Sequence, residues 1–293
     1  MKSIVFIHGI NNQDNTPAWI EETWWSAIQQ GWKAAGLESR PKPEIRSAYY
    51  ADILAGESSS PQAEAMGDGA EPFSGLAMEF LKTYQVQAGI DDEEINRILN
   101  KELNEPSIEE MGEGRGVIVR IARAIASALP GNGKYLARLF LKQAAVYIDR
   151  EGLRAQIHHT VSEQVFAKRP APTVVIGHSL GTVVGFNVLC GQDFGNQNLR
   201  VPLFITLGSP LGIDMMDKVV PPFGTFPTPP IEAWFNGFRK DDFVPLDTSL
   251  KKQTIGFDGI ENHRTKMIDG VDPHSIEGYL RDKAVATKLH DFL

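Results

Sequence analysis

The feature that most constrains the fold of this chain is a serine flanked by glycines, placed between a strand pattern and a helix pattern. Gly177-His178-Ser179-Leu180-Gly181 follows the β-branched run Thr173-Val174-Val175-Ile176 and precedes an apolar stretch over 182–189. Small residues on both sides of a serine let strand and helix approach closely, so the pattern predicts a tight turn that presents the hydroxyl above a sheet. We therefore interpret Ser179 as a nucleophile rather than as an ordinary turn residue.

A second turn follows the first strand pattern of the chain. Ser3-Ile4-Val5-Phe6-Ile7 predicts a short buried strand, and His8-Gly9-Ile10 comes directly after it. With the serine motif, this turn resembles the α/β-hydrolase family, specifically its bacterial serine esterase and lipase-like members. The resemblance implies an oxyanion hole made by the backbone N–H groups of Ile10 and Leu180. We do not interpret His8 as a base and expect it to pack or hydrogen-bond beneath the loop.

The segment Trp234–Pro245 predicts a strand that runs into a turn with two carboxylates. Its end, Asp242-Phe243-Val244-Pro245, resembles the D-x-V-P segment of lipase-like hydrolases, in which the aspartate orients the catalytic histidine. The resemblance therefore implies that Asp242 is the triad acid. Adjacent carboxylates cannot be separated by sequence alone, so Asp241 stays open as the alternative. In either case the acid must be ionised, partly buried and hydrogen-bonded to the imidazole Nδ1–H.

Three histidines follow the acid, as the chain order Ser, Asp, His of this family requires. They are His263, His274 and His290. We favour His274 because Val271-Asp272-Pro273 places it in a loop before a helix pattern. With the later tyrosine it also resembles the His-x-x-x-x-Tyr pattern of the lipase-like members. His290 lies near a helical C-terminus, where a surface histidine is the ordinary expectation.

The composition suits one large α/β domain without a disulfide. The chain has 293 residues, of which 42% are hydrophobic, enough for a substantial core. Its single cysteine, Cys190, excludes an intramolecular disulfide and a cysteine-based zinc cluster, and we expect it to pack in the helix after the serine. No P-loop, H-E-x-x-H or G-x-G-x-x-G pattern is present, so we expect neither a metal nor an organic cofactor. The net charge of −8 disfavours nonspecific binding to nucleic acid.

No targeting segment is visible in the sequence. The first residues enter a strand pattern directly, without a positively charged region followed by a long apolar stretch. No other stretch is long and apolar enough to cross a bilayer. We therefore expect a cytoplasmic protein, and signal-independent export stays open.

The hydrolase-like patterns fall into two blocks around an insertion. The first block ends near Asp52, after a helix pattern over 19–35 and a strand pattern over 44–50, and the second runs from about Tyr147 to Leu293. Alternation of strands with helical sequence predicts an α/β fold, a mostly parallel central sheet flanked by helices in one domain over 1–293. The tryptophans of the first helix are expected in the core rather than in a binding site. They are Trp19, Trp24, Trp25 and Trp32.

Residues 53–146 do not continue this alternation. A stretch over 55–75 is rich in Gly, Ser, Pro and Ala, which predicts a mobile loop. Helix patterns follow at about 76–88, 91–104 and 116–129. Helical insertions of this kind in α/β-hydrolases form caps, so the resemblance implies a helical cap that shapes the acyl pocket. A lipase lid that contacts a membrane peripherally has the same periodicity and is the alternative.

The insertion also separates its charges. Acidic residues cluster between Asp91 and Glu113, whereas 115–148 carries basic residues and no acidic one. The simpler interpretation is a pair of solvated helices that partly neutralise each other. The alternative is that the basic helices approach an anionic substrate or lipid headgroups.

A long segment rich in apolar residues and proline follows the strand pattern over 201–207. Substrates of open α/β folds bind on this side of the sheet, so its large apolar side chains are candidate pocket-wall residues. Packing beneath the loop is the equal alternative. The candidates are Met215, Met216, Phe223 and Phe226.

Together these patterns predict a serine hydrolase that cleaves carboxylic esters through an acyl-enzyme, with Ser179, His274 and Asp242 as its triad. The apolar segments near the predicted site favour lipid or lysophospholipid esters as substrates. Thioester or amide hydrolysis and acyl transfer use the same constellation. A noncatalytic hydrolase-fold binding protein is the alternative of another class. Oligomeric state and biological role do not follow from the sequence.

Overall fold

The computed structural model describes residues 3–59, 75–107, 115–131, 133–167, 172–191, 199–221, 230–268 and 270–293. The chain divides into two compact units. One comprises Met1–Tyr50 with Ile157–Leu293, and the other comprises Ala51–Gln156. The insertion predicted over 53–146 falls within the second unit, and its function as a cap stays a prediction.

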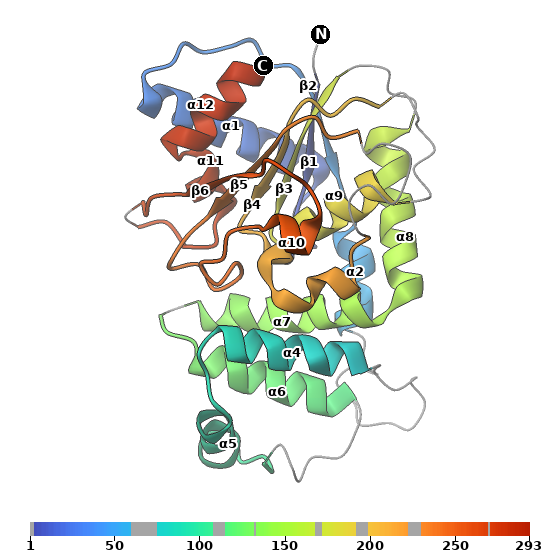
Figure 1. The fold of residues 1–293 in the computed structure, drawn as a ribbon, viewed down its shortest axis with the longest axis vertical. Helices are drawn as coiled ribbons and strands as arrows, with labels where there is room; N and C mark the ends of the chain where they lie inside the picture. The colour runs from blue at the N-terminus through green and yellow to red at the C-terminus, as the bar shows by residue number, and fades with distance from the viewer. Residues whose placement is uncertain are drawn as a thin grey trace. The chain divides into compact units, whose positions relative to one another are not determined.

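The first unit is built on a six-stranded sheet (Figure 1). Its strands are β1 (Ser3–Ile7), β2 (Glu44–Ala48), β3 (Thr173–His178), β4 (Phe204–Leu207), β5 (Trp234–Phe238) and β6 (Glu261–Arg264). They lie in the order β2-β1-β3-β4-β5-β6, and every neighbouring pair is parallel. The α/β fold and the parallel sheet predicted from the sequence are thus confirmed.

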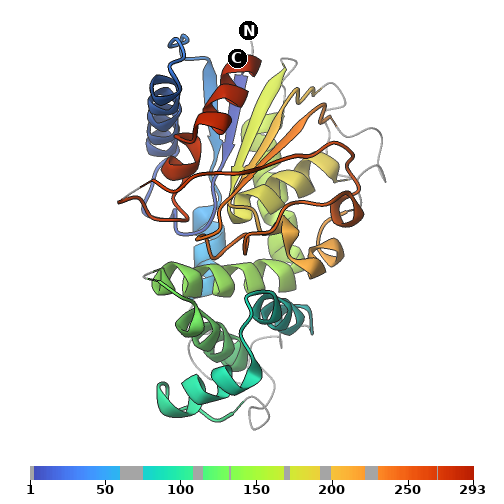
Figure 2. The same cartoon turned by 60° about the vertical axis from the view of Figure 1, so that its left-hand side comes forward.

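Helices cover both faces of this sheet (Figures 1 and 2). One face is covered by α1 (Pro17–Ala35), α11 (Ile276–Leu280) and α12 (Lys283–Phe292), which form a common core with it. Trp24 of α1 packs on Phe6 of β1 at a ring distance of 4.9 Å, and Trp32 donates to Ala286 O at 3.0 Å. Trp24, Trp25 and Trp32 are therefore core residues as expected, whereas Trp19 is half exposed.

The opposite face is covered by α9 (Leu180–Cys190), the helix that follows the serine. All of its residues are buried, and Phe186 packs on Trp234 of β5 at a ring distance of 5.3 Å. Cys190 is buried at the end of this helix as expected, and burial raises the pKa of its thiol to about 12. The thiol therefore stays protonated and packs as a small apolar group.

The sequence did not predict β6, because Glu261-Asn262-His263-Arg264 has no apolar residue. An edge strand pairs on one side only and does not need two buried faces. Its place is fixed by polar side chains instead. Asn236 of β5 donates to Asn262 Oδ1 at 3.0 Å, and the Asn262 side chain also bonds the backbone N–H and C=O of Leu250 at 2.8 and 2.9 Å.

The second unit is helical in its described residues. Its helices are α2 (Ala51–Ser59), α4 (Gly75–Gln87), α5 (Asp92–Lys101), α6 (Arg115–Ala128) and α7 (Lys134–Asp149). The predicted helix patterns correspond to α4, α5 and α6, whereas α7 was not predicted as a separate helix. Phe140 of α7 packs on Phe80 and Tyr84 of α4 at ring distances of 6.3 and 6.2 Å. The chain returns to the sheet through α8 (Glu151–Val161) and a π-helical turn over Ser162–Phe166.

The mobile loop predicted over 55–75 is wrong at its start, because α2 extends through Ser59. Glycine disfavours a helix whereas alanine favours one, so composition alone does not decide the conformation of Ala55 and Gly56, and α2 is held by its contacts with α7. The remainder of that segment, 60–74, lies outside the described residues.

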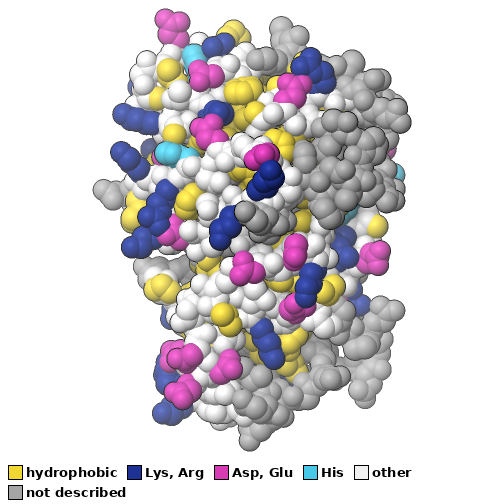
Figure 3. All heavy atoms as spheres, in the orientation of Figure 1, with side chains coloured by type: hydrophobic (Ala, Val, Ile, Leu, Met, Phe, Trp, Pro, Cys, Tyr) yellow, Lys and Arg dark blue, Asp and Glu magenta, His cyan; other side chains and the backbone are white. Residues whose placement is uncertain are grey.

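Charged side chains in the second unit pair with one another. Arg120 of α6 lies 3.1 Å from Glu105, and Arg97 lies 2.8 Å from Glu94 within α5. These contacts favour the solvated, mutually neutralising interpretation of the charge pattern. On the molecular face drawn in Figure 3, basic and acidic side chains are likewise interspersed. None of the helices in the described residues combines the length and apolar character that a membrane span needs.

Candidate active site

The candidate residues lie in loops that follow parallel strands. Ile10 comes after β1, Ser179 after β3, Asp242 after β5 and His274 after β6. The carboxyl ends of parallel strands lie at one edge of a sheet, which is where open α/β folds bind their ligands. The topology therefore collects all of these residues at the same edge.

Ser179 occupies a strained turn between β3 and α9. Its φ of 55° and ψ of −132° lie where residues other than glycine are rarely found. Its N–H donates to Leu207 O at 3.0 Å, and its C=O accepts from the Thr182 N–H at 3.0 Å and from Thr182 Oγ1 at 2.7 Å. A Cβ at Gly181 would lie 2.2 Å from Ile7 O, so only glycine lets α9 approach β1 here. The predicted strand, turn and helix are confirmed.

The structure brings Asp242 and His274 together. His274 Nδ1 lies 2.9 Å from Asp242 Oδ2, and the backbone N–H of Val244 donates to Asp242 Oδ1 at 2.9 Å. Tyr279 Oη also donates to Asp242 Oδ2, at 2.6 Å. All three side chains are buried. A carboxylate held in this way fixes the orientation of the imidazole and leaves Nε2 as the free acceptor.

The alternative acid, Asp241, faces a different partner. It accepts hydrogen bonds from Arg239 Nε at 3.1 Å and Nη2 at 2.9 Å, and the arginine is almost completely buried. The structure thus pairs Asp242, not Asp241, with His274.

The alternative histidines are also engaged elsewhere. His263 lies in β6 with Nε2 3.4 Å from Asp282 Oδ1, and His290 lies in α12 with Nε2 3.2 Å from Glu38 O. Of the three candidates, His274 is the one that contacts Asp242.

Ser179 Oγ and His274 Nε2 are both buried and have no hydrogen-bond partner. Buried polar atoms are normally paired, so two orphans on neighbouring loops indicate groups kept for a ligand rather than for folding. The two atoms do not bond to each other in this structure. Catalytic hydrogen bonds often tighten only when a substrate binds, so this separation is compatible with a nucleophile and its base.

His178, the second residue of the glycine-serine motif, supports the loop of His274. Its Nε2 donates to His274 O at 2.9 Å, and the two imidazole rings lie 4.6 Å apart. Burial, and next the proximity of His274, lowers the pKa of His178 well below its usual value. It is therefore a neutral hydrogen-bond donor. Sequence reasoning assigned it no role, although its place beside the serine was a usable signal.

The loop after β1 lies against the serine. A Cβ at Gly9 would lie 2.5 Å from Ser179 Cβ and 3.1 Å from Ser179 Oγ, so a side chain there would collide with the serine. The Gly9 carbonyl is held by His8 Nδ1 at 2.7 Å and by Asn12 Nδ2 at 3.3 Å. In a trans peptide the N–H points opposite to the C=O, so these bonds also fix the direction of the Ile10 N–H.

The expectation that His8 packs beneath this loop is confirmed. Its Nε2 accepts from the backbone N–H of Tyr50 at 3.2 Å, and its ring stacks on the Tyr50 ring at 4.3 Å. The other predicted oxyanion donor, Leu180, is the first residue of α9. The N–H groups of a first helical turn have no partner within the helix and carry the positive end of its dipole.

The predicted pocket-wall residues are only partly described. Met215 and Met216 lie in a short 3₁₀ turn, Asp214–Lys218, and are buried to 3% and 1% exposure. This burial favours their packing beneath the loop. Phe223 and Phe226 lie outside the described residues.

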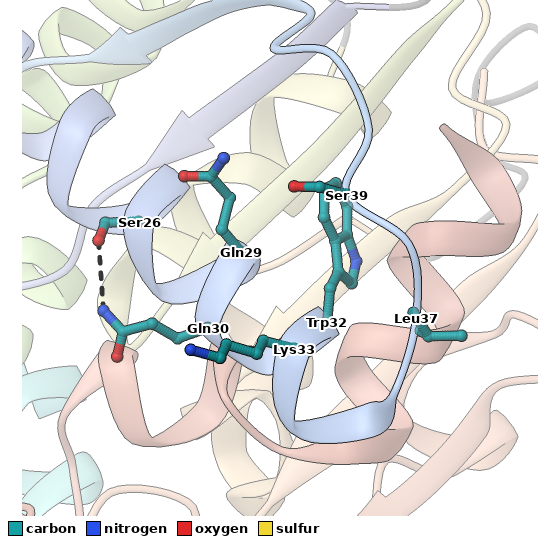
Figure 4. Close-up of a pocket in the computed structure, with 7 residues that line it drawn as sticks. All are labelled: Ser26, Gln29, Gln30, Trp32, Lys33, Leu37 and Ser39. Carbon is teal, nitrogen blue, oxygen red and sulfur yellow. Dashed lines mark hydrogen bonds between the residues drawn. The ribbon is translucent and has the colours of Figure 1, made fainter.

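A separate shallow groove of about 520 Å³ lies along α1 (Figure 4). Its lining is mostly amide, hydroxyl and aliphatic, and Gln30 donates to Ser26 Oγ within it at 3.2 Å. The lining residues are Ser26, Gln29, Gln30, Trp32, Lys33, Leu37 and Ser39. None of them belongs to the constellation around Ser179, so we do not assign this groove to the candidate active site.

Within the described ranges, no three His, Cys, Asp or Glu side chains gather as metal ligands would. No known family model matches the chain. None of the curated proteins matches its sequence significantly. The candidate active site therefore rests on the geometry of this chain alone.

Proposed function

We propose that this chain is a serine hydrolase of the α/β-hydrolase fold that cleaves carboxylic esters, with Ser179 as nucleophile, His274 as base and Asp242 as acid. One observation carries the proposal. A buried Asp242–His274 pair at 2.9 Å shares a sheet edge with a serine held in a strained strand–helix turn. The orphaned Nε2 and Oγ are the two atoms between which a proton must pass in acyl transfer.

In the first step, Ser179 Oγ forms a bond to the ester carbonyl carbon while His274 Nε2 takes the hydroxyl proton. The carbonyl oxygen becomes an oxyanion that faces the N–H groups of Ile10 and Leu180. Each such donor is worth about 3 kcal/mol of transition-state stabilisation. Asp242 stabilises the imidazolium. When the intermediate collapses, the bond to the alcohol oxygen breaks, and His274 returns the proton to that oxygen.

In the second step, water replaces the alcohol. His274 Nε2 takes a proton from water as the water oxygen attacks the acyl carbon, and the same N–H groups hold the second oxyanion. Collapse breaks the bond to Ser179 Oγ, which regains the proton from His274, and the carboxylic acid leaves. Neither step requires a metal or an organic cofactor.

The proposal is tested by intact-mass analysis after incubation with a fluorophosphonate, on the unaltered protein and on Ser179→Ala. An activated serine is expected to take one phosphonyl group per chain, mapped to the peptide that contains Ser179, and the variant is expected to take none. Hydrolysis of a series of p-nitrophenyl esters should then follow the labelling. A folded protein that neither takes the label at Ser179 nor hydrolyses any ester in the series would contradict the proposal.

Asn12→Ala is expected to lower kcat about 10- to 100-fold with a smaller effect on KM. Asn12 Nδ2 donates to the carbonyls of Gly9 and Ile10 at 3.3 and 2.9 Å and so fixes the peptide that carries one oxyanion donor. Loss of an oxyanion donor outright costs about 100- to 1,000-fold, and a loosened donor should cost less. Steady-state kinetics on the fastest ester measures the effect.

Gln13→Ala is the matched control, because this exposed side chain in the same loop donates only to the Asn11 side chain, at 3.3 Å. It should keep the kcat of the unaltered protein. Equal losses in both variants would mean that the loop tolerates no substitution and that Asn12 has no special role.

A further inference from the structure

Two donors converge on a single oxygen of Asp242. Its Oδ2 accepts from His274 Nδ1 at 2.9 Å and from Tyr279 Oη at 2.6 Å, whereas Oδ1 accepts from the backbone of Val244. The Asp242–His274 pair is the acid–base pair of the proposed reaction. The hydroxyl of Tyr279 takes no part in the steps of that reaction, although it lies as close to Asp242 as His274 does.

The short segment after β6 positions both donors. His274 precedes α11, and Tyr279 lies in that helix, five residues later in the chain. Tyr279 is fully buried, and its ring lies 6.2 Å from that of His178. His178 in turn donates to the His274 carbonyl at 2.9 Å. The hydroxyl of Tyr279 is therefore held in place by its own helix and by core packing.

Tyr279 remains a proton donor over the whole working range of such a site. Burial, followed by the negative charge of Asp242, raises the pKa of its hydroxyl well above the usual value. A donor to a carboxylate stabilises the charged form of that carboxylate and makes it a weaker proton acceptor. Because both donors share Oδ2, the bond from Tyr279 weakens the attraction of Asp242 for the proton of His274.

The other polar groups around the pair do not duplicate this effect. Arg239 and Asp241, on the loop after β5, bind each other at 2.9 Å, so their charges largely cancel. Asp272 Oδ1 accepts from the backbone N–H of His274 at 2.8 Å. His178, on β3, is neutral because its burial lowers its pKa. Tyr279 is thus the side chain, besides His274, that donates directly to the acid.

We propose that Tyr279 is a positioning residue of the Ser179–His274–Asp242 site, whose hydroxyl fixes the Asp242 carboxylate and limits the proton affinity of the Asp242–His274 pair. This inference rests on the proposed function, because it assigns Tyr279 to the same acid–base pair. Without the hydroxyl, Asp242 binds the imidazolium more strongly, and His274 gives up its proton only at higher pH. A base that is protonated cannot accept the proton of the serine.

The test is the pH profile of kcat/KM for Tyr279→Phe, which removes the hydroxyl and keeps the ring. The acid limb, which reports the deprotonation of His274, is expected to move up by about one pH unit. Activity should then fall about tenfold on the acid side and recover in part at higher pH. A role confined to folding would lower activity evenly across the profile. Tyr135→Phe is the control, since Tyr135 is 69% exposed and lies in the other unit.

A second variant tests the opposite direction without removing the hydrogen bond. A ring-fluorinated tyrosine introduced at position 279 is a stronger donor, so it should move the acid limb to lower pH. The fluorinated variant therefore still tests the role of Tyr279 if Tyr279→Phe does not fold.

Fluorophosphonate labelling of Ser179 in the same preparations separates the two proposals. If the unaltered protein is not labelled and hydrolyses no ester, the proposed function itself fails. If it is labelled and active but neither change at position 279 moves the acid limb, only the role of Tyr279 is overturned.

Discussion

Ser179→Ala is expected to lower ester turnover about a million-fold and to leave the folded state as stable as before, or more stable. Removal of a serine nucleophile costs about this factor in a comparable triad, where the residual rate comes from binding and the oxyanion hole. The effect on stability has the opposite sign to that of most buried substitutions. Ser179 Oγ is buried without a hydrogen-bond partner, so the folded state carries an uncompensated desolvation cost that alanine removes.

The strain of the turn does not change this expectation. Serine and alanine both carry a Cβ, so the cost of the positive φ at position 179 is the same in both proteins. Removal of an unpaired buried hydroxyl is worth about 1 to 3 kcal/mol. The free energy of unfolding, measured with urea by circular dichroism, should therefore be equal or higher in the variant. A clear loss of stability would mean that the hydroxyl holds the turn together and is not kept free for a reaction.

Ser209→Ala is the matched control, because Ser209 is a buried serine whose hydroxyl is fully engaged. Its Oγ lies 2.7 Å from Thr182 Oγ1 and accepts from the Leu211 N–H at 3.2 Å. Its removal leaves the buried Leu211 N–H without this acceptor and takes one of the two hydrogen bonds of the Thr182 hydroxyl, so it should destabilise the fold by about 1 to 3 kcal/mol. Ser209→Ala should thus lower the free energy of unfolding whereas Ser179→Ala should not, because the hydroxyl of Ser209 is hydrogen-bonded in the fold and that of Ser179 is not.

Local pattern was enough to predict most of the sheet. Strands β1 and β3 are buried on both faces and read as uninterrupted apolar runs, and the turn at Ser179 was marked by its flanking glycines. The strand that was not predicted, β6, depends on contacts between segments that are distant in the chain. The polar strand β6 is held by Asn236 and Asn262, and no local period reports such a contact.

The site followed the same rule. The turn at Ser179 could be predicted from its local pattern, but which of Asp241 and Asp242 pairs with His274 required knowing where Arg239 lies. Its guanidinium binds Asp241 at 3.1 and 2.9 Å, which leaves the next carboxylate for the histidine. The supporting groups His178 and Tyr279 each act through one hydrogen bond to a residue distant in the chain, whereas Asn12 acts through two bonds within its own loop. Of these, only Tyr279 was marked beforehand, by its spacing from His274.

Asp242→Asn is expected to lower kcat about 10,000-fold, the effect of the same change in a known triad. The amide removes the charge that stabilises the imidazolium. It also cannot satisfy its surroundings, because Oδ2 accepts from His274 and Tyr279 while Oδ1 accepts from the Val244 N–H. Whichever way the amide turns, its NH₂ group meets a donor, and turning it toward His274 forces the imidazole into the wrong tautomer.

Asp241→Asn separates the two neighbouring carboxylates, because it should damage stability and largely spare turnover. Arg239 is 1% exposed, and without the charge of Asp241 its guanidinium stays buried and unbalanced. Breaking such a pair costs about 3 kcal/mol, somewhat less where one partner is partly exposed, as Asp241 is. Asp241→Asn should therefore show the larger loss in the free energy of unfolding, and Asp242→Asn the larger loss in kcat. Urea unfolding and steady-state kinetics measure both quantities at a temperature where each variant is folded. If Asp241→Asn lost turnover at unchanged stability while Asp242→Asn stayed active, the two aspartates would have to exchange roles in the mechanism.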